Sequence, residues 1–525
     1  MRTPAQKQKP RIARSTSVPA PTGGWIKSRN LATPGSRKSP GAEVLENWFP
    51  TATGCRMRHG SQKYATLGSA DVAALFTYSN GSNRRLFGAC GAGIYDITTV
   101  ADAGTPPAAA VSGLTGDDWS AVQFSTPGGT FLRCVNGSDV PRVFDGAAWA
   151  STPAITGTGL TDTDLCFVWT HGQRLFFVEK DSLDAWYLPV DAIGGTASVL
   201  PLGGVFNLGG SLLFGGTWSI EAGDGLSEQC VFVTTEGEVA VYQGADPSTA
   251  ATWRKVGVYK IGRPLGRDAF IRAGGDLVVA TDIGFIPLSQ AIQRDVAALA
   301  PAAVSYPIET AWNDAVASRP GAWRCVVWPK RQMVLVATPY SADAVSQMLV
   351  ANARTGAWCV FTGWLGTSMV VFGDRCFFGT SGGKVIEAEV TGYDQGQPYT
   401  ASFVPLFDDL GSPSSLKIAL EARAVLLSSS AVDETLSVQT DYVVDLPVPP
   451  AASAVLASGT WGTAIWGTDT WGQARKQIVV QEWRSVSGSG GALAPSIQIT
   501  SGASVPPTVD LVRIDLTFDT ADIVT

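Results

Sequence analysis

Between about residues 67 and 395, short runs of β-branched, aromatic and other apolar residues alternate with turns rich in Gly and Asp. Apolar runs of this length, joined by short Gly-containing turns, predict antiparallel β-hairpins. The runs 230–233 and 238–242, for example, flank the turn Glu236-Gly237. The pattern of this region is therefore that of strands rather than helices.

The hairpins recur at a nearly regular spacing. Their starts lie about 43 to 56 residues apart, and their cores are 85–97, 131–149, 174–190, 229–243, 275–288, 331–350 and 374–389. Repeats of this length with several strands each are typical of β-propeller blades, which bury their faces only by stacking around an axis. The repeats share a pattern rather than identical residues, so six, seven or eight blades all fit. Helical signals are confined to 287–300, with Pro287 near its start, and to 307–317.

The pattern changes after residue 395. Longer β-runs at 417–426 and 510–518 enclose a Pro/Ala-rich spacer at 446–457 and an array of Trp-Gly pairs. These features predict a C-terminal β-sandwich-like domain over 396–525. The fold class is thus all-β, with a β-propeller over 67–395. Residues 40–66 are expected to be an extended segment that leads into the propeller, and 1–39 a basic, disordered or extended arm.

Composition supports an all-β chain with a large core. The 525 residues include 58 Gly, 45% are hydrophobic and only 16% are charged. No apolar run is long enough for a transmembrane helix, and residues 1–25 lack the apolar core of a signal peptide. The eight cysteines form no C-x-x-C pair, and several stand within apolar runs. We expect small buried side chains in a protein made in a reducing cytoplasm.

Charge divides the chain unevenly. The first 38 residues hold nine basic residues and no acidic one, so the formal net charge of −7 leaves −16 on the remainder. A basic arm of this kind can contact nucleic acid or an acidic partner, and it can equally be a solvated terminus.

The sequence shows few residues suited to catalysis. The two histidines, His59 and His171, are far apart and have no second ligand at metal-binding spacing. A G-x-S-x-G match around Ser381 joins two predicted strands, whereas the hydrolase motif needs a strand, a sharp turn and a helix. The acidic pairs Asp162/Asp164 and Asp408-Asp409 could bind a cation, but turn chemistry explains them more simply. We therefore expect no enzymatic activity, no cofactor and no metal site.

The Trp-Gly array places Trp461, Trp466 and Trp471 five residues apart. Residues five apart on a strand face opposite sides, so the array is not one stacking surface. Successive turns, each fixed by a ring, fit the spacing better. Packing of a long loop and docking of a partner or carbohydrate both remain open, and these tryptophans are our candidates for a subunit interface.

Several stretches resemble the tail hub (nozzle) proteins of short-tailed bacteriophages, once described as DNA-stabilisation proteins. They are 45–50 (LENWFP), 56–61 (RMRHGS), 136–146 (NGSDVPRVFDG), 276–289 (DLVVATDIGFIPLS), 352–358 (NARTGAW), the Trp-Gly array and 508–518. The resemblance covers most of 40–525 and includes no catalytic motif.

This resemblance implies a non-enzymatic propeller protein of the virion tail, assembled in the host cytoplasm. It implies a homo-hexameric ring below the portal and adaptor proteins, near tail fibres or spikes. There the ring would extend the DNA channel, contact phage DNA transiently and help retain the packaged genome. An acidic body suits such a channel, because each Lys or Arg contact to phosphate adds affinity for DNA.

Two other function classes remain. One is a receptor- or carbohydrate-binding propeller module of a tail or secreted protein. Its usual signs are a signal peptide, a trimeric coiled coil or repeated aromatic-acid pockets, and the sequence shows none of these. The other is a propeller enzyme that acts on glycans or uses a quinone. The scarcity of histidines and the lack of repeated S-x-D-x-G-x-x-W boxes argue against it.

Overall fold

The computed structural model describes residues 13–27, 40–100, 103–222, 225–249, 251–339, 347–428, 432–452 and 477–523. The chain divides into two compact units. The propeller unit comprises Gln62–Ala353 and Thr362–Ala388, and the sandwich unit comprises Met1–Ser61, Arg354–Phe361 and Glu389–Thr525.

Seven groups of three or four paired strands form the main part of the propeller unit within the described residues, each built mainly from strands consecutive in the chain. The first four are β6 (Val72–Asn80), β7 (Asn83–Cys90), β8 (Gly93–Asp96), β9 (Ala109–Ser112); β10 (Ser120–Thr126), β11 (Gly129–Val135), β12 (Arg142–Phe144), β13 (Trp149–Ala150); β15 (Leu165–His171), β16 (Arg174–Glu179), β17 (Asp184–Tyr187), β19 (Ser198–Pro201); and β20 (Leu212–Ala222), β21 (Gly225–Thr234), β22 (Glu238–Gln243), β23 (Arg254–Lys260). The last three are β24 (Phe270–Ala273), β25 (Asp276–Thr281), β26 (Gly284–Pro287); β27 (Arg324–Trp328), β28 (Met333–Ala337), β29 (Gln347–Asn352); and β31 (Ser368–Phe372), β32 (Arg375–Gly379), β33 (Lys384–Thr391) with β5 (Gly60–Thr66).

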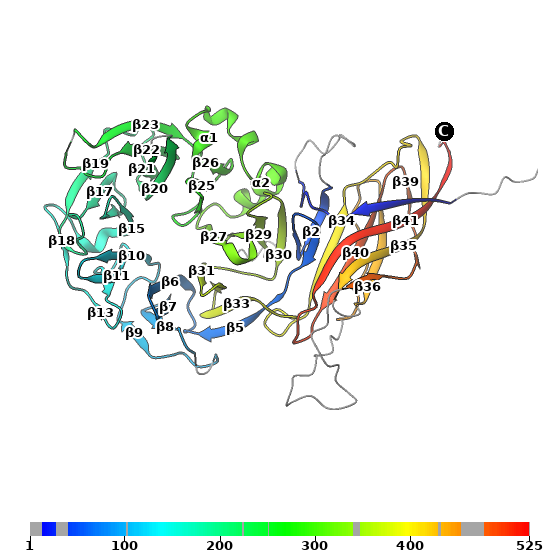
Figure 1. Ribbon diagram of the computed structural model, residues 1–525, viewed down its shortest axis with the longest axis horizontal. Coiled ribbons are helices and arrows are strands. Elements are labelled where there is room, and N and C mark those ends of the chain that lie inside the picture. The colour runs from blue at the N-terminus through cyan, green and yellow to red at the C-terminus, as the bar shows by residue number, and fades with distance from the viewer. Residues whose placement is uncertain are drawn as a thin grey trace, which may run out of the picture. The chain divides into compact units, whose positions relative to one another are not determined.

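The sheets are blades of one closed propeller (Figure 1). Contacts run from β6 to β10, β15 and β20, continue through β25, β24 and β27 to β31, and return from β31 to β6. Each of the seven hairpins predicted from the sequence falls on a different blade. The all-β class and the propeller are therefore confirmed, and seven blades lie within the predicted range.

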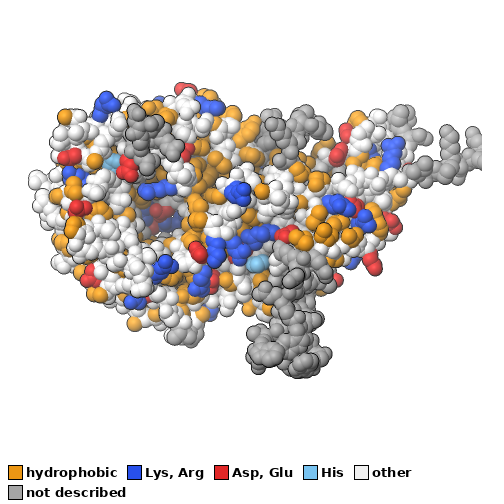
Figure 2. All heavy atoms as spheres, in the orientation of Figure 1, with side chains coloured by type: hydrophobic (Ala, Val, Ile, Leu, Met, Phe, Trp, Pro, Cys, Tyr) orange, Lys and Arg blue, Asp and Glu red, His pale blue; other side chains and the backbone are white. Residues whose placement is uncertain are grey.

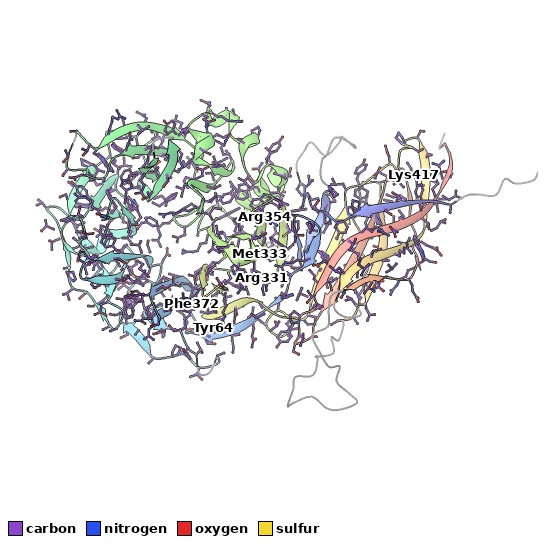
Figure 3. All side chains as sticks on the ribbon, in the orientation of Figure 1. Tyr64, Arg331, Met333, Arg354, Phe372 and Lys417 are labelled. Carbon is purple, nitrogen blue, oxygen red and sulfur yellow. The ribbon has the colours of Figure 1, made fainter. Side chains whose placement is uncertain are left out.

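The ring is closed by a strand that precedes the first blade in the sequence. Strand β5 lies beside β33 at the outer edge of the seventh sheet. Tyr64 of β5, labelled in Figure 3, packs against Phe377 of β32 with ring centres 4.8 Å apart. The backbone N–H of Leu67 donates to the carbonyl of Gly383 at 2.7 Å. The seventh blade is thus built from residues that come both before and after the other six blades in the sequence.

Helices are few and short. The predicted helix over 307–317 is confirmed as α2 (Glu309–Ser318), whereas 287–300 contains only α1 (Leu288–Ala291) followed by 3₁₀ turns at Val296–Ala298 and Ala300–Ala302. The remaining 3₁₀ turns are Asp162–Asp164, Tyr306–Ile308 and Pro329–Arg331, and β14 (Ile155–Thr156) pairs in parallel with β18 (Gly195–Thr196). Among the described helices, none has the length and apolar character needed to cross a membrane.

The sandwich unit consists of two sheets. One contains β3 (Trp48–Pro50), β4 (Cys55–Met57), β41 (Val509–Ile523), β35 (Ser415–Ser428) and β37 (Gln477–Val480), with β1 (Arg14–Pro19) on β41 and β38 (Arg484–Ser485) and β39 (Ser489–Gly490) on β35. The other contains β30 (Trp358–Thr362), β2 (Ala42–Glu46), β34 (Tyr399–Pro405), β40 (Leu493–Ser501) and β36 (Glu434–Thr440). Buried residues of both sheets, among them Val438, Leu493 and Phe518, form one core. The predicted β-sandwich-like domain is confirmed.

The sandwich unit also includes segments that the sequence boundaries placed elsewhere. Residues 40–61, expected to lead into the propeller, supply β2, β3 and β4, and only 62–66 of that segment belong to the propeller unit. Within the expected arm of 1–39, β1 pairs with β41 over six residues, so this part is an ordered strand. The strand gave no sequence signal because it pairs through its backbone and carries polar side chains.

The residues that follow β1 are packed into the sandwich unit. Trp25 is buried, and its indole N–H donates to the carbonyl of Glu43 at 3.0 Å. Gly24 has a φ of +76°, and a Cβ there would lie 2.6 Å from the carbonyl oxygen of Trp358. This close approach requires glycine. The rest of the arm lies outside the described residues.

Candidate functional site

The clearest candidate site is a cavity of about 540 Å³ on the axis of the propeller. All seven blades line it, each through its first strand or the residue or two before it. Figure 2 shows the hollow at the centre of the ring, with acidic and basic side chains inside it. Its polar and charged lining includes Gln123, Thr170, Asp268, Arg272, Arg324 and Ser368.

The period of a β-strand explains how the fifth blade contributes to this cavity. Asp268, Phe270 and Arg272 are spaced two residues apart, at and just before β24, and all three line the cavity. Alternate residues of a strand share a face, so one edge of the blade presents an acid, a ring and a base in turn.

Four charged residues form a cluster that we call the axial ion cluster: Asp118, Arg267, Asp268 and Arg324. One Asp118 oxygen lies 2.7 Å from Nη2 of Arg324 and 2.8 Å from Nη2 of Arg267. Nη1 of Arg324 also pairs with Asp268. Asp118 precedes the first strand of the second blade, whereas its partners lie on the fifth and sixth blades. Because these blades are not neighbours in the ring, the ion pairs bridge across the propeller axis.

Backbone contacts hold the cluster in place. Arg267 donates from Nη1 to the carbonyl of Cys166 at 2.9 Å and from Nη2 to the carbonyl of Asp118 at 3.0 Å. The N–H of Cys325 donates to the carbonyl of Asp268, also at 2.9 Å. The cluster therefore links the second, third, fifth and sixth blades.

Neighbouring charges in the axial ion cluster favour the ionised forms of Asp118 and Arg324. Burial alone would raise the pKa of Asp118, but the guanidinium groups of Arg267 and Arg324 outweigh it and hold the pKa below its ordinary value. Burial likewise opposes the charge on Arg324, yet Asp268 and Asp118 raise its pKa above the ordinary value. At neutral pH Asp118 and Arg324 are therefore ionised and paired with each other.

Arg272 also lines the cavity but is not part of the axial ion cluster. It is exposed, and no ion pair or hydrogen bond of its side chain occurs within the described residues. Thr170, on β15, is half-buried and also lines the cavity. The cavity therefore contains one guanidinium that is free to bind a ligand.

His171 has a structural environment. It is 3% exposed, its Nε2 lies 2.7 Å from the carbonyl of Gly244, and its Nδ1 lies 3.2 Å from the hydroxyl of Thr217. Burial lowers its pKa. The ring packs against Phe176 and Trp253, so it helps to join the third and fourth blades.

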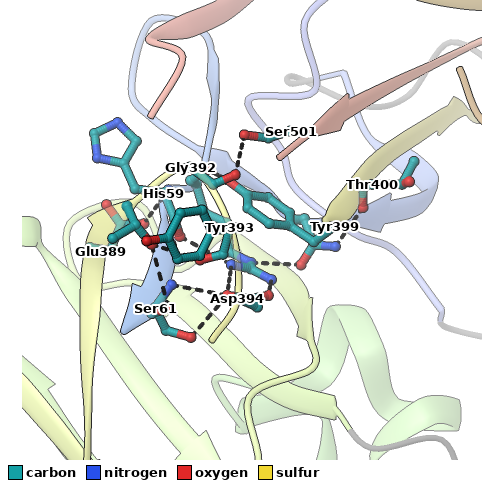
Figure 4. Close-up of polar contacts among 12 residues, drawn as sticks. His59, Ser61, Glu389, Gly392, Tyr393, Asp394, Tyr399, Thr400 and Ser501 are labelled. Carbon is teal, nitrogen blue, oxygen red and sulfur yellow. Dashed lines mark hydrogen bonds and ion pairs between the residues drawn. The ribbon is translucent and has the colours of Figure 1, made fainter. Parts of the chain in front are cut away.

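His59 lies beside a buried polar network in the sandwich unit (Figure 4). Arg58, which is fully buried, donates to both carboxylate oxygens of Asp394, at 2.5 and 3.1 Å, and to Asn47 at 2.7 Å. Its guanidinium lies 4.1 Å from the ring centre of Tyr399, whose hydroxyl donates to the Arg58 carbonyl. Burial raises the pKa of Tyr399.

Further bonds complete this network. Ser61 donates to Asp394 through its N–H and its hydroxyl, at 3.0 and 2.9 Å. The N–H of His59 donates to Glu389 at 3.1 Å, and Arg56 pairs with the same carboxylate at 3.0 Å. The multiply bonded Arg58–Asp394 pair fixes the course of the chain and leaves this carboxylate little capacity for chemistry.

Ser381 stands on an exposed turn between β32 and β33, and no helix follows it. Glycines of the G-x-S-x-G match serve packing. Gly383 has a φ of +73°, and a Cβ there would lie 2.1 Å from the carbonyl oxygen of Gly68. The expected strand–turn–strand context is confirmed.

The acidic pairs occupy turns, as expected. Asp408 accepts from the N–H of Leu410 at 2.8 Å, and Asp409 accepts from the N–H of Gly411 at 3.0 Å. Asp162 and Asp164 bound a 3₁₀ turn. Within the described residues, no group of three or more His, Cys, Asp or Glu side chains is placed to hold a metal ion.

The cysteines are described by the structure, whereas the Trp-Gly array is not. All eight cysteines are free thiols, and six of them are buried, as predicted. Burial raises the pKa of Cys166 to about 11.

Trp461, Trp466 and Trp471 lie outside the described residues, so their interface role stays a prediction.

Comparison with known proteins gives distant structural similarity only. No family model and no curated protein sequence matches the chain. Two crystal structures of BBS1N in complex with ARL6DN, soaked with mercury or lead, are 10% identical, with TM-scores of 0.35 and 0.36; they cover 64% and 66% of this chain and 97% and 98% of their own. YCF48 from Cyanidioschyzon merolae is 9% identical, with a TM-score of 0.29, over 63% of this chain and 98% of its own. At these scores nothing about function follows from the similarity.

Proposed function

We propose that this chain is a non-catalytic structural protein: a subunit of the tail hub ring of a short-tailed bacteriophage, below the portal and adaptor, which extends the DNA channel and helps retain the genome. The proposal rests mainly on where the structure places residues of the stretches that resemble the tail hub proteins. Asn47, Arg58 and Ser61 belong to the stretches 45–50 and 56–61, and all three bond within the buried network around Asp394. These two stretches therefore contain residues that stabilise the buried network of the sandwich unit.

The axial cavity limits where DNA could pass. A cavity of about 540 Å³, bridged by ion pairs, is too small for a duplex whose major groove alone is about 12 Å wide. A DNA channel must therefore lie at the centre of a ring of several copies and not inside one propeller. The excess of acidic residues outside the arm suits the walls of such a channel.

The decisive experiment is the mass of the assembled protein, measured by native mass spectrometry. Six copies of the 55.0 kDa chain weigh about 330 kDa, and we expect a closed ring of that mass. A stable monomer at all concentrations would overturn the proposal and favour a receptor- or carbohydrate-binding module.

A variant tests the proposed interface. Replacing Trp461, Trp466 and Trp471 together with Ala should reduce the fraction of rings, because aromatic side chains dominate the binding energy of most interfaces. The matched control is Trp483→Ala, which removes a tryptophan that is 38% exposed on the sandwich unit. Ring formation that survives the triple change, together with a lower melting temperature, would assign the array to core packing.

A further inference from the structure

We propose that the axial cavity of the propeller binds a small organic anion, a molecule that carries a carboxylate or phosphate group, with Arg272 as its charged contact. The cavity volume of about 540 Å³ falls within the roughly 300–1,000 Å³ typical of small-molecule sites. Lining by all seven blades gives the site a rigid frame.

The charges inside the cavity select an anion. Asp268 and Arg324 line it but neutralise each other as an ion pair. Arg272 is then the one charged lining group without an ion-pair partner in the described residues. A guanidinium offers a planar fork of donors that matches the two oxygens of a carboxylate or phosphate. A cation would meet an uncompensated like charge and is excluded.

The remaining walls define the body of the ligand. Thr170 provides a hydroxyl group, and Phe270 stands between the axial ion cluster and Arg272 along β24. Asp268 and Arg272 are four positions apart along extended chain, about 13 Å at the usual rise per residue. Because the ion cluster bridges the axis, a long polymer cannot thread through. A molecule of about the size of one sugar ring fits this space.

The probes are inorganic phosphate, glucuronate and glucose, measured by isothermal titration calorimetry on the full chain. Phosphate and glucuronate should bind, whereas glucose, the neutral counterpart of glucuronate, should bind at least about tenfold more weakly, because it lacks the charge-assisted hydrogen bonds. Phosphate binding without glucuronate binding would identify the ligand as a phosphate compound, and the reverse as a carboxylate. Equal binding of glucose and glucuronate would contradict the proposal, as would no binding of either anion.

Variants assign the effect to one side chain. Arg272→Gln should weaken binding of the anions at least about tenfold, since it keeps the polar character but removes the charge. The control Arg263→Gln removes an arginine that is 68% exposed, pairs with Glu236 and does not line the cavity, so binding should not change. An equal loss in both variants would mean nonspecific charge attraction and would overturn the proposal.

A second substitution covers the case in which Arg272→Gln disturbs folding. Arg272→Lys keeps the charge and loses the fork, so it should bind the anions more weakly than the wild type. Wild-type affinity in a folded Arg272→Lys variant, at both low and high salt, would rule out the guanidinium contact. The proposal is independent of ring assembly, because the whole site lies in one propeller and its failure would not alter the mass of the assembled protein.

Discussion

The propeller and sandwich units are made of the same kind of strands, but they differ in how far apart the paired strands lie in the sequence. Six of the seven blades form from consecutive hairpins, so their hydrogen-bond partners are close along the chain. In the sandwich unit β1 pairs with β41, and the hydrogen bond from Ser17 to Asp515 spans 498 positions. The comparison shows that one all-β chain can combine a locally encoded repeat with a domain assembled from its two ends.

The largest expected effect concerns the buried network of the sandwich unit. Arg58→Ala leaves the Asp394 carboxylate buried without its cation, and the loss of one partner of a buried pair costs about 3–5 kcal/mol. Urea unfolding followed by hydrogen exchange should show early opening of strands β34 and β40, whereas blades one to four keep their protection.

The matched control is Arg263→Ala on the propeller, which removes an arginine that is 68% exposed and pairs with Glu236. Exposed pairs contribute about 0–1 kcal/mol, so we expect a small change. An equal loss of stability in the two variants would mean that the buried pair of the sandwich unit stabilises the protein no more than the exposed pair of the propeller does.

A deletion of residues 1–27 should also destabilise the sandwich unit. It removes β1 and the buried Trp25, and the loss of a buried tryptophan side chain alone costs about 3–5 kcal/mol. Differential scanning calorimetry measures the effect, and a deletion of residues 1–12, which retains β1, is the control. A stable protein without residues 1–27 would show that the terminal strand adds little to the sandwich.

A smaller effect is expected in the propeller. Asp118→Asn weakens the cross-axis pairs with Arg267 and Arg324, and we expect a loss of about 1–2 kcal/mol because the Asp118 side chain is half-exposed. The pKa of Asp118 is lowered in the folded protein, so its contribution is complete above the ordinary value of about 3.9 and disappears as pH falls through the folded value.

Thermal unfolding of Asp118→Asn and wild type at pH 7 and pH 3 tests this sign. The difference between the two proteins should shrink at the lower pH. Asp374→Asn, which loses an exposed pair with Lys330, should show no such dependence.

The smallest effect belongs to Ser381→Ala. The side chain is exposed on a turn, so stability should change by no more than about 0.5 kcal/mol, and infectivity of particles that carry the variant should be unchanged. Lost infectivity with normal assembly would point to catalysis at this serine.

The sequence predicted the propeller well because its signals are local. A hairpin such as 229–243 carries its own alternation and its own Gly237 turn, and both strands of the pair appear in one window of the chain. The helix at Glu309–Ser318 was found for the same reason. Where a run was apolar but broken, as in 287–300, the structure contains short turns in place of one helix.

The axial ion cluster and the terminal strands could not be predicted from the sequence. Arg267 and Arg324 reach Asp118 across 149 and 206 positions, and no spacing rule relates such residues until the ring is closed. Asp268, Phe270 and Arg272 did show a period of two, but the sequence does not reveal which end of a blade faces the axis. For β1, the polar side chains concealed a strand that is defined by its backbone.

The closure of the seventh blade by β5 has a consequence for synthesis on the ribosome. Strand β5 is made before every other propeller strand, yet its partner β33 ends 325 residues later. At about 5–20 residues per second, the wait lasts roughly 15 to 65 seconds. During that time β5 is a nascent strand with a free edge, and Lys63 within it is the kind of charged residue that discourages pairing with a foreign strand. The order of the strands makes this propeller a ring that cannot close until three quarters of the protein has been translated.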